Sequence, residues 1–304
     1  MQSLKEQTIT ILTVSFNSSL HLKRLFYNII NKSDKPDNIN FLVIDNTNGK
    51  DNKLYSLFDK KDNVKIIKNN CHSSQRSISH ASGLDNGLKN IDTDFTLILD
   101  PDIHIFMENW DLFCIKKITL NEKTVIGAPY PQWKLGKVHD YPSVVFMFFK
   151  TDLVKHFCKT FYPFSSPLLR VINSIIRKIV RLGGIANKKN MDRFNFIRSF
   201  CSKLEKLTGI SSPDTGKEII EQFRKNNFQS IVFDTPYKSD LIGNNEAELS
   251  KLAEDFEVFL YQDDPFMTHM YSSGVYHWRT HNSSNLKFWQ TLIYDVERKI
   301  LKVS

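Results

Sequence analysis

The 304-residue sequence contains little cysteine and no long apolar run. Its four cysteines (Cys71, Cys114, Cys158 and Cys201) lie far apart and form no Cys-x-x-Cys pair. This spacing argues against a zinc site or a dense disulfide framework and favours a reducing compartment. No uncharged apolar stretch is long enough to cross a membrane, and the first residues lack the apolar core of a signal peptide. These absences predict a cytoplasmic protein.

The positive charge is concentrated in one segment. The chain has a formal net charge of +8. Residues 168–208 contain ten Lys or Arg and two acidic residues, which gives +8 for that segment alone, so the rest of the chain is balanced. A nucleic-acid-binding protein more often spreads positive charge over a face that also carries aromatic side chains. We therefore expect no nucleic-acid partner.

The first hundred residues alternate between strand and helix patterns. Strand patterns are short, β-branched and apolar, whereas helix patterns repeat apolar residues every three or four positions. This order predicts an α/β fold with a mostly parallel central sheet and helices on both faces. The carboxyl ends of such strands share one edge, outside which ligands bind. The predicted strands are residues 8–16, 40–45, 64–67 and 95–99, and the predicted helices are 20–31 and 77–91.

The second half of the chain is less regular. It contains a basic and mainly helical insertion over residues 168–207, broken at Gly183-Gly184. Residues 266–277 predict a strand or a hairpin around Ser273-Gly274. The other predicted strands are residues 125–129, 143–149 and 230–233, and the other predicted helices are 151–161, 215–226, 245–256 and 286–301.

Two carboxylates directly follow the fourth predicted strand, in the segment Asp100-Pro101-Asp102. In an extended turn, residues i and i+2 point the same way, so both carboxylates can face one cation. Hard oxygen ligands suit Mg²⁺ or Mn²⁺, and such an ion would neutralise the phosphates of a nucleoside diphosphate. Asp-Pro-Asp is also ordinary turn chemistry. Its place behind a buried strand of an α/β chain favours the metal site.

Three segments in this order resemble the opening of a family 2 glycosyltransferase: TVSFNSS, VIDNTNGKD and SHASGLDNGLKNIDTDFTLILDPDI. The resemblance covers residues 8–105 well, and 125–152 and 211–282 more loosely. It implies a single GT-A domain over residues 1–304 and a nucleotide-sugar donor. It also implies metal-dependent transfer with inversion to a glycan or a lipid-linked glycan. The predicted parts are a nucleotide-binding half (1–105), an acceptor and catalytic half (106–282) with the insertion at about 163–210, and a C-terminal helix (283–304).

The resemblance also implies roles for individual side chains. Asp45, at the end of the second strand, is expected to contact the nucleobase, although an acidic residue there can also simply form a turn. Asp100 and Asp102 are expected to serve ribose, metal and diphosphate. Polar residues that open the helix before the fourth strand can reach the nucleotide or act as a solvated helix cap. The remaining nucleotide-binding candidates are Thr13, Ser15, Asn17, Arg76 and His80.

The sequence offers more than one carboxylate for the catalytic base. Inverting transfer needs a group that takes the proton of the acceptor hydroxyl. Relatives supply an acidic residue at the start of a late helix, and Asp214 matches that context, although Pro213 stands where the family usually has a second acidic residue. Asp214 could also be a plain helix N-cap. The alternative carboxylates are Asp263 and Asp264.

Many relatives add a late histidine to the metal ligands. Three histidines lie within thirteen residues here: His269, His277 and His281. An imidazole can join two carboxylates around Mn²⁺. His269 is the preferred ligand because it follows an apolar run, as a residue at a strand end would. A packed or solvated histidine is the competing interpretation.

The insertion has no counterpart in the family pattern. Its segment VINSIIRKIVRL mixes apolar residues with arginine and lysine along a helix. That composition suits peripheral contact of residues 168–208 with an anionic membrane surface, or binding of an anionic acceptor such as a lipid-linked glycan. A solvated helical lid fits the composition equally well.

Two other functions remain open from the sequence. A nucleotidyltransferase would also use paired carboxylates and a metal, but it usually has a glycine-rich phosphate loop near the first strand, and TVSFNSS contains no glycine. The second is a non-catalytic module that binds a sugar nucleotide or a glycan. The intact Asp100-Pro101-Asp102 segment and Asp214 argue against it.

Overall fold

The computed structural model describes residues 7–71, 75–157, 160–163, 167–211, 214–241, 247–270 and 285–302. The chain divides into two compact units, which are described separately. The sheet unit comprises Met1–Ala128, Asp140–Pro163 and Thr215–Val232. The helical unit comprises Pro129–His139, Phe164–Asp214 and Phe233–Ser304. The chain therefore leaves the sheet unit after Ala128 and after Pro163, returns to it each time, and leaves it again after Val232.

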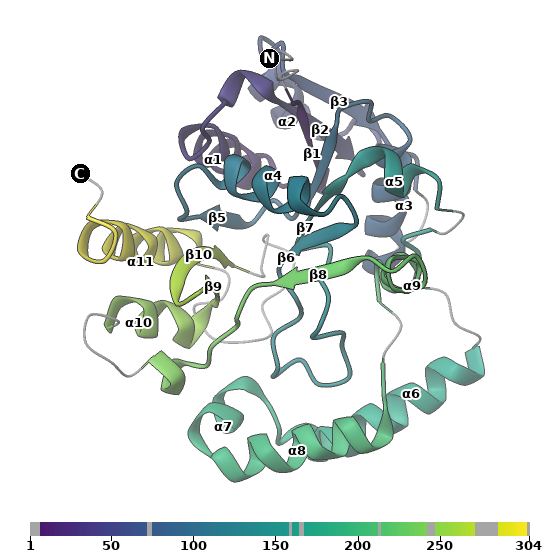
Figure 1. The fold of residues 1–304 in the computed structure, drawn as a ribbon, viewed down its shortest axis with the longest axis vertical. Coiled ribbons are helices and arrows are strands. Elements are labelled where there is room, and N and C mark those ends of the chain that lie inside the picture. The colour runs from purple at the N-terminus through teal and green to yellow at the C-terminus, as the bar shows by residue number, and fades with distance from the viewer. Residues whose placement is uncertain are drawn as a thin grey trace. The chain divides into compact units, whose positions relative to one another are not determined.

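The sheet unit is built on a seven-stranded sheet with the strand order β3-β2-β1-β4-β7-β6-β8 (Figure 1). Neighbouring strands are parallel from β3 to β4 and between β6 and β8, and only β7 runs antiparallel to its neighbours. The predicted α/β class with a mostly parallel sheet is therefore confirmed. The strands are β1 (Ile9–Ser15), β2 (Ile39–Asp45), β3 (Val64–Lys68), β4 (Phe95–Leu99), β6 (Thr124–Gly127), β7 (Phe146–Lys150) and β8 (Gln229–Val232).

The strand order creates a switch point beside β1. From β1 the chain first adds β2 and β3 on one side, and then crosses to add β4 on the other side. All residues of β1 and β4 are buried, which is expected for central strands covered on both faces. Ligands of open α/β sheets bind outside the carboxyl ends of the strands at such a switch point. The turn after β4 lies there.

Helices cover both faces of this sheet. On one face, Phe26 of α1 (Ser19–Asn31) packs against Phe41 of β2, with ring centroids 4.8 Å apart. On the other face, α3 (Arg76–Leu88) approaches β1 closely, because a Cβ atom at Gly87 would lie 2.1 Å from Cδ1 of Leu12. The unit also contains η1 (Pro36–Asn38), α2 (Asn52–Phe58), the short strand β5 (Ile103–Ile105), α4 (Trp110–Leu120), α5 (Thr151–Lys155) and α9 (Lys217–Lys225).

The helical unit has its own hydrophobic core. The basic insertion forms α6 (Pro167–Val180), η2 (Leu182–Gly184), α7 (Lys188–Arg193) and α8 (Asn195–Thr208). These helices pack on the loop 129–139 and on Tyr237 through a cluster that includes Trp133, Val180 and Cys201. The helical insertion and its break at Gly183-Gly184 are therefore confirmed. The unit also contains η3 (Lys238–Leu241), α10 (Ala247–Asp255) and α11 (Leu286–Lys299).

The two strands β9 (Glu257–Tyr261) and β10 (Asp264–His269) form an antiparallel hairpin in the helical unit. Gln262 and Asp263 connect them, and both have positive φ angles, of 51° and 69°. Positive φ at both positions of a two-residue turn matches the twist of the flanking strands. The predicted region 266–277 is a strand up to His269, and residues 271–284 lie outside the described residues.

Some predicted boundaries were wrong. The helix predicted over 151–161 ends at Lys155. The carboxylate of Asp85 instead accepts hydrogen bonds from the Thr160 hydroxyl and the Phe161 amide, so tertiary contacts fix that segment. The helix predicted from 215 begins at Lys217 after Gly216. Helices α2 and α4 and strands β5 and β9 were not predicted. None of the helices within the described ranges is long and apolar enough to span a bilayer.

Candidate metal and nucleotide site

The turn after β4 brings two carboxylates together at the switch point of the sheet unit. Asp100 and Asp102 have carboxylate oxygens within 4.8 Å of each other, which is close enough to share one cation. The amide of Asp100 donates to the carbonyl of Val145 at 3.1 Å. Val145 directly precedes strand β7, so this hydrogen bond holds the turn against the start of that strand. The Asp100 side chain is 20% exposed, whereas Asp102 is 4% exposed. One carboxylate is thus accessible and the other is enclosed.

Helix α1 holds β5, the strand directly after this turn. The Asn28 side-chain amide donates to the carbonyl of Ile105 at 3.0 Å, and its oxygen accepts from the amide of the same residue at 2.7 Å. The Arg24 guanidinium donates to the Ile103 carbonyl and lies 3.2 Å from Nδ1 of His104. Side chains of α1 therefore replace a neighbouring strand along this edge of β5. They fix the backbone that follows Asp102.

His21 adds a titratable group beside the enclosed carboxylate. It lies on α1 and is 8% exposed. Burial lowers the pKa of His21, the charge of Asp102 opposes that shift, and the Arg24 charge lowers the pKa further. His21 was not among the site residues predicted from the sequence. The available signal was that His21, Arg24 and Asn28 recur every three or four residues, which places their polar side chains along one stripe of the helix.

The helix α3 carries a second histidine toward the site. Nε2 of His80 lies 3.6 Å from Oδ1 of Asp100, and both side chains are partly exposed. Arg76 is the first residue of α3, at the end where backbone amides point out of the helix. The structure thus brings His80 to the predicted metal-binding turn.

Asp45 lies at the carboxyl end of β2 and is fully buried. Its Oδ1 accepts from the amide and the hydroxyl of Thr47, at 2.8 and 2.6 Å. Its Oδ2 accepts from the Gly49 amide at 2.7 Å and from the Tyr55 hydroxyl at 2.8 Å. Burial, followed by this hydrogen bond, raises the pKa of Tyr55 to about 12. Four donors already occupy the carboxylate that we expected to contact a nucleobase.

Three further predicted residues lie around the end of β1. Thr13 and Ser15 are fully buried, and neither hydroxyl has a hydrogen-bond partner among the described residues. Buried polar groups are normally satisfied, so each of these two hydroxyls needs an explanation. Asn17 follows the strand in an exposed position with a φ angle of 55°. Of these three side chains, only Asn17 is open to solvent.

The predicted metal ligand His269 lies in the helical unit, at the end of β10, and is 1% exposed. Its cross-strand neighbour is Glu257, and Nδ1 of His269 lies 2.9 Å from a Glu257 oxygen. The other Glu257 oxygen pairs with Nζ of Lys134 at 2.9 Å. An ionised Glu257 favours the proton on Nδ1, which leaves the lone pair of Nε2 as a possible ligand. Glu257 was not among the predicted site residues, because strand β9 was not predicted.

The predicted base Asp214 also belongs to the helical unit. It forms an ion pair with Lys137 and keeps 24% of its side chain exposed. Burial lowers the pKa of Lys137, and the charge of Asp214 opposes that shift. The N-cap of α9 is Gly216, so Asp214 precedes the helix and does not cap it. The alternatives Asp263 and Asp264 are exposed at the β9–β10 turn, and His277 and His281 lie outside the described residues.

Comparison with known proteins identifies solved structures but no family. No family model matches the chain, and no curated protein matches it. TarS 1–349 from S. aureus is 17% identical with a TM-score of 0.36, over 49% of this chain and 48% of that chain, and it has also been solved with UDP-GlcNAc. The mannosyltransferase PcManGT from Pyrobaculum calidifontis, in complex with GDP-Man and Mn²⁺, is 12% identical with a TM-score of 0.42, over 66% of this chain and 70% of that chain. The chain thus spans about half the length of the TarS chain. At such low identities and TM-scores, these structures do not show what this chain binds or which reaction it catalyses.

Proposed function

We propose that the protein is a metal-dependent glycosyltransferase of the GT-A type. It moves a sugar from a nucleotide-sugar donor, with inversion, to a glycan or a lipid-linked glycan. The observation that carries this proposal is the carboxylate pair of Asp100 and Asp102 at the switch point of the sheet. A parallel sheet directs ligands to this edge, and two adjacent carboxylates need a cation before a diphosphate can approach them.

The proposed ligands of the metal are Asp100, Asp102 and His269. Two carboxylates and one imidazole form a donor set suited to Mn²⁺, and the carboxylates suit Mg²⁺ as well. The bond from His269 to Glu257 supports the third assignment, because histidines that bind metals usually donate their other nitrogen to a carboxylate. When bound, the ion would neutralise the diphosphate and the charge that develops on it as it leaves.

The chain's own residues carry the remaining steps of this proposal. Asp214 accepts the proton of the acceptor hydroxyl as that oxygen attacks the anomeric carbon. The ion pair with Lys137 would hold the Asp214 carboxylate in position for this role. A positive charge on Arg76 or His80 would favour the diphosphate. His80 stands beside Asp100, where such a contact would be made.

The nucleoside contacts are proposed for the ends of β1 and β2. Asn17 is the most accessible candidate. Asp45 is proposed to hold the loop that contacts the base, and it reaches the base itself only if a donor such as Tyr55 turns away. The hydroxyls of Thr13 and Ser15 have unused bonding capacity and are proposed to face the nucleotide after a local opening of the strand end.

Calorimetry with nucleoside diphosphates tests the proposal. We expect UDP or GDP to bind in Mn²⁺ and to lose most of its affinity when the metal is chelated. Asp100→Asn should weaken this binding, whereas Asp263→Asn, at the exposed hairpin turn, should not change it. Equal affinity with and without metal would contradict the metal site. Hydrolysis or transfer of a nucleotide sugar by the wild type but not by Asp100→Asn then distinguishes an enzyme from a binding module.

A further inference from the structure

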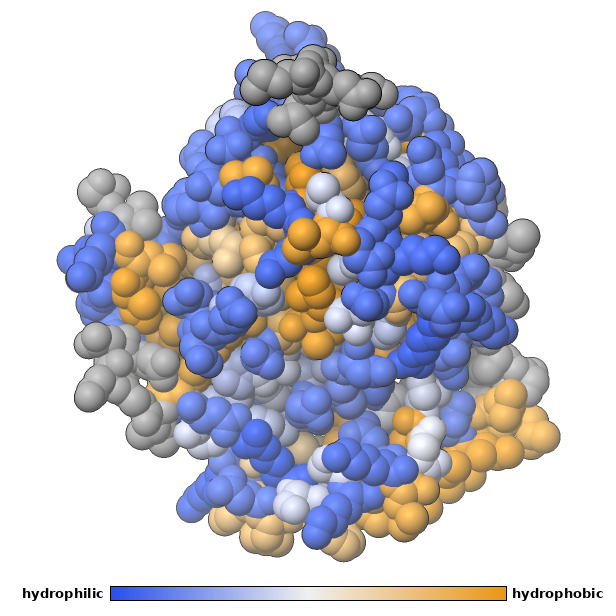
Figure 2. Space-filling view, in the orientation of Figure 1, coloured by the Kyte–Doolittle hydropathy of each residue, from blue (hydrophilic) through white to orange (hydrophobic). Residues whose placement is uncertain are grey.

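Helix α6 carries a continuous apolar stripe on its exposed side. Leu168, Val171, Ile172, Ile175 and Ile179 are each between 40% and 69% exposed. Their positions differ by three, four, seven and eleven residues from the first, which places all five on one side of an α-helix. Figure 2 shows hydrophobic surface gathered at the lower right of the view, over α6. Exposed apolar patches of this kind commonly mark an interaction site.

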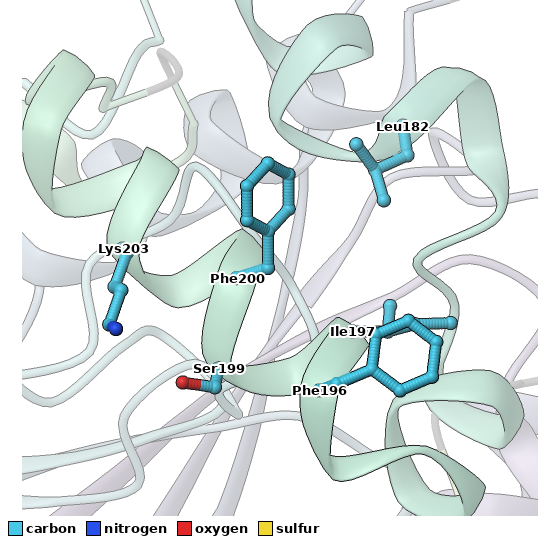
Figure 3. A pocket seen from close by; sticks show the side chains of 6 residues that line it. All are labelled: Leu182, Phe196, Ile197, Ser199, Phe200 and Lys203. Atoms are coloured by element: carbon cyan, nitrogen blue, oxygen red, sulfur yellow. The ribbon is translucent and has the colours of Figure 1, made fainter.

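Helix α8 repeats the pattern with aromatic side chains. Phe196, Phe200 and Leu207 are 71%, 51% and 84% exposed, at spacings of four and seven residues. Phe196 and Phe200 line a hollow together with Leu182 of η2, and Lys203 contributes to the same lining (Figure 3). The insertion therefore exposes apolar side chains from two of its helices and from the turn between them.

These exposed side chains are not needed for the packing of α6 and α8 in the hydrophobic core of the helical unit. The inner side of α6 already packs through Val180 and Ile176, and that of α8 through Ile197 and Cys201. The apolar stripes lie on other sides of the same helices. Eleven of the sixteen large hydrophobic residues exposed in the described part of the chain fall between Leu168 and Leu207. The exposed apolar surface is thus concentrated in one short segment.

The acidic and basic residues of this segment also lie on different sides: the acidic side chains face inward and most basic side chains are exposed. Its acidic residues turn inward: Asp192 accepts from the Ser239 amide at 2.8 Å, and Glu205 accepts from the Gly136 amide and lies 3.2 Å from His139 Nε2. The outer surface therefore keeps mainly positive charge beside the apolar stripes. The exposed basic residues are Lys178, Lys189, Arg193, Lys203 and Lys206.

We propose that α6 and α8 dock the protein on an anionic lipid bilayer, with the apolar stripes at the boundary between headgroups and acyl chains. An interfacial helix combines a large apolar stripe with flanking lysine and arginine, and its binding grows with buried apolar area and with anionic lipid. The lysines provide the attraction to the surface, and the aliphatic and aromatic side chains provide the anchoring. The proposal does not depend on the reaction that the protein catalyses.

The charge pattern favours a bilayer over a second copy of the chain. A symmetric dimer through this surface would bring two equally basic segments together, and like charges across an interface are unfavourable. A soluble glycan would have no use for exposed leucine, isoleucine and phenylalanine side chains. An anionic bilayer satisfies both the charge and the apolar surface.

Vesicle co-sedimentation tests the proposal with the full chain. We expect binding to phosphatidylcholine vesicles that contain phosphatidylglycerol, and much weaker binding to phosphatidylcholine alone. The double variant Ile172→Glu, Ile175→Glu should lower the partition coefficient at least about tenfold, because it removes two inserted side chains and adds negative charge. The matched control is Leu120→Glu, since Leu120 is 85% exposed on α4 of the sheet unit. Equal losses in both variants would contradict the proposal.

A spectroscopic variant locates the contact. Ile175→Trp should show blue-shifted emission on anionic vesicles and quenching by brominated acyl chains, whereas Leu120→Trp should show neither. Unchanged emission of Ile175→Trp in the presence of bound vesicles would overturn the assignment of this surface. Concentration-dependent dimerisation that Ile172→Glu, Ile175→Glu abolishes would overturn it in favour of a second copy. Nucleoside diphosphate binding measured on the same variants should stay unchanged, which separates this test from that of the proposed function.

Discussion

In β1, all seven residues are buried, whereas in α6 the leucine, valine and isoleucine side chains of one stripe face outward. Both segments look apolar in the sequence. The strand is covered because helices lie on both faces of its sheet, and the helix has core contacts on one side only. An apolar pattern therefore predicts burial only when the surrounding elements cover it. The exposed apolar side chains of α6 indicate a role other than packing in the core, which is the proposed contact with a bilayer.

The two units also differ in how they present acidic groups. The sheet unit places Asp100 and Asp102 side by side at a strand end, whereas the helical unit pairs Asp214 with Lys137 and Glu257 with Lys134. The largest expected effect tests the first arrangement. Asp102→Asn should lower the rate of sugar transfer at least about 10³-fold, because a metal that stabilises the leaving diphosphate contributes several kcal/mol. The measurement is steady-state transfer at saturating Mn²⁺. The melting temperature of the variant should stay close to that of the wild type. A transfer rate close to that of the wild type would contradict the assignment of Asp100 and Asp102 as metal ligands.

Asp214→Asn tests the helical unit in the same assay. Asparagine keeps the size of the side chain but cannot accept the proton, so we expect the rate to fall by about 10²–10⁴-fold while donor affinity is kept. A rate within a few-fold of the wild type would exclude Asp214 and move attention to Asp263 and Asp264. Loss of donor binding together with rate would show that the pair with Lys137 is structural.

Glu257→Gln changes a residue that contacts the proposed metal ligand His269 and not the metal itself. The amide no longer favours the His269 tautomer with a free Nε2, and residues in this position commonly change metal affinity about 10–100-fold. The readout is the Mn²⁺ concentration that gives half of the metal-dependent rise in melting temperature. Lys134 loses its partner in this variant, so the metal-free melting temperature should fall as well.

Glu254→Gln is the matched control for that measurement, because Glu254 is 58% exposed and pairs with Lys238 on the surface. It should leave the Mn²⁺ dependence unchanged. A fall in metal-free stability of Glu257→Gln with no change in the Mn²⁺ midpoint would mean that Glu257 has only a structural role.

The smallest expected effect concerns stability alone. Asn28→Ala removes both side-chain partners of the buried Ile105 backbone and should lower the free energy of unfolding by about 2–3 kcal/mol. Asn31→Ala, on an exposed position at the end of the same helix, should change it by less than about 0.5 kcal/mol. Chemical denaturation followed by circular dichroism measures both. Equal effects would show that the loss arises from helix propensity and not from the contact with β5.

The sequence predicted the sheet well because strand periodicity and burial agree there. The strand 95–99 was placed to the residue, and the turn after it holds the two carboxylates as expected. The role of Asp45 could not be decided from the sequence, because an acidic residue at a strand end can either bind a ligand or stabilise the turn that follows it. In the structure, all four hydrogen bonds to its carboxylate come from nearby residues. Glu257 could not be found, because a buried ion pair depends on residues distant in sequence. The inward orientation of the Asp192 and Glu205 side chains could not be predicted for the same reason, since their partners Ser239 and His139 are distant in sequence.

The pairing of Asn28 with Ile105 has a consequence for how the protein behaves in concentrated solution. A short strand with an uncovered edge offers amides and carbonyls to any passing chain, and such edges are common starting points for aggregation. Here a single side chain occupies the amide and the carbonyl of Ile105, and Arg24 occupies the carbonyl of Ile103. The α1 side of β5 is therefore closed to strand addition by an arginine and an asparagine. These two residues protect this edge of the strand and also fix the backbone that follows the turn.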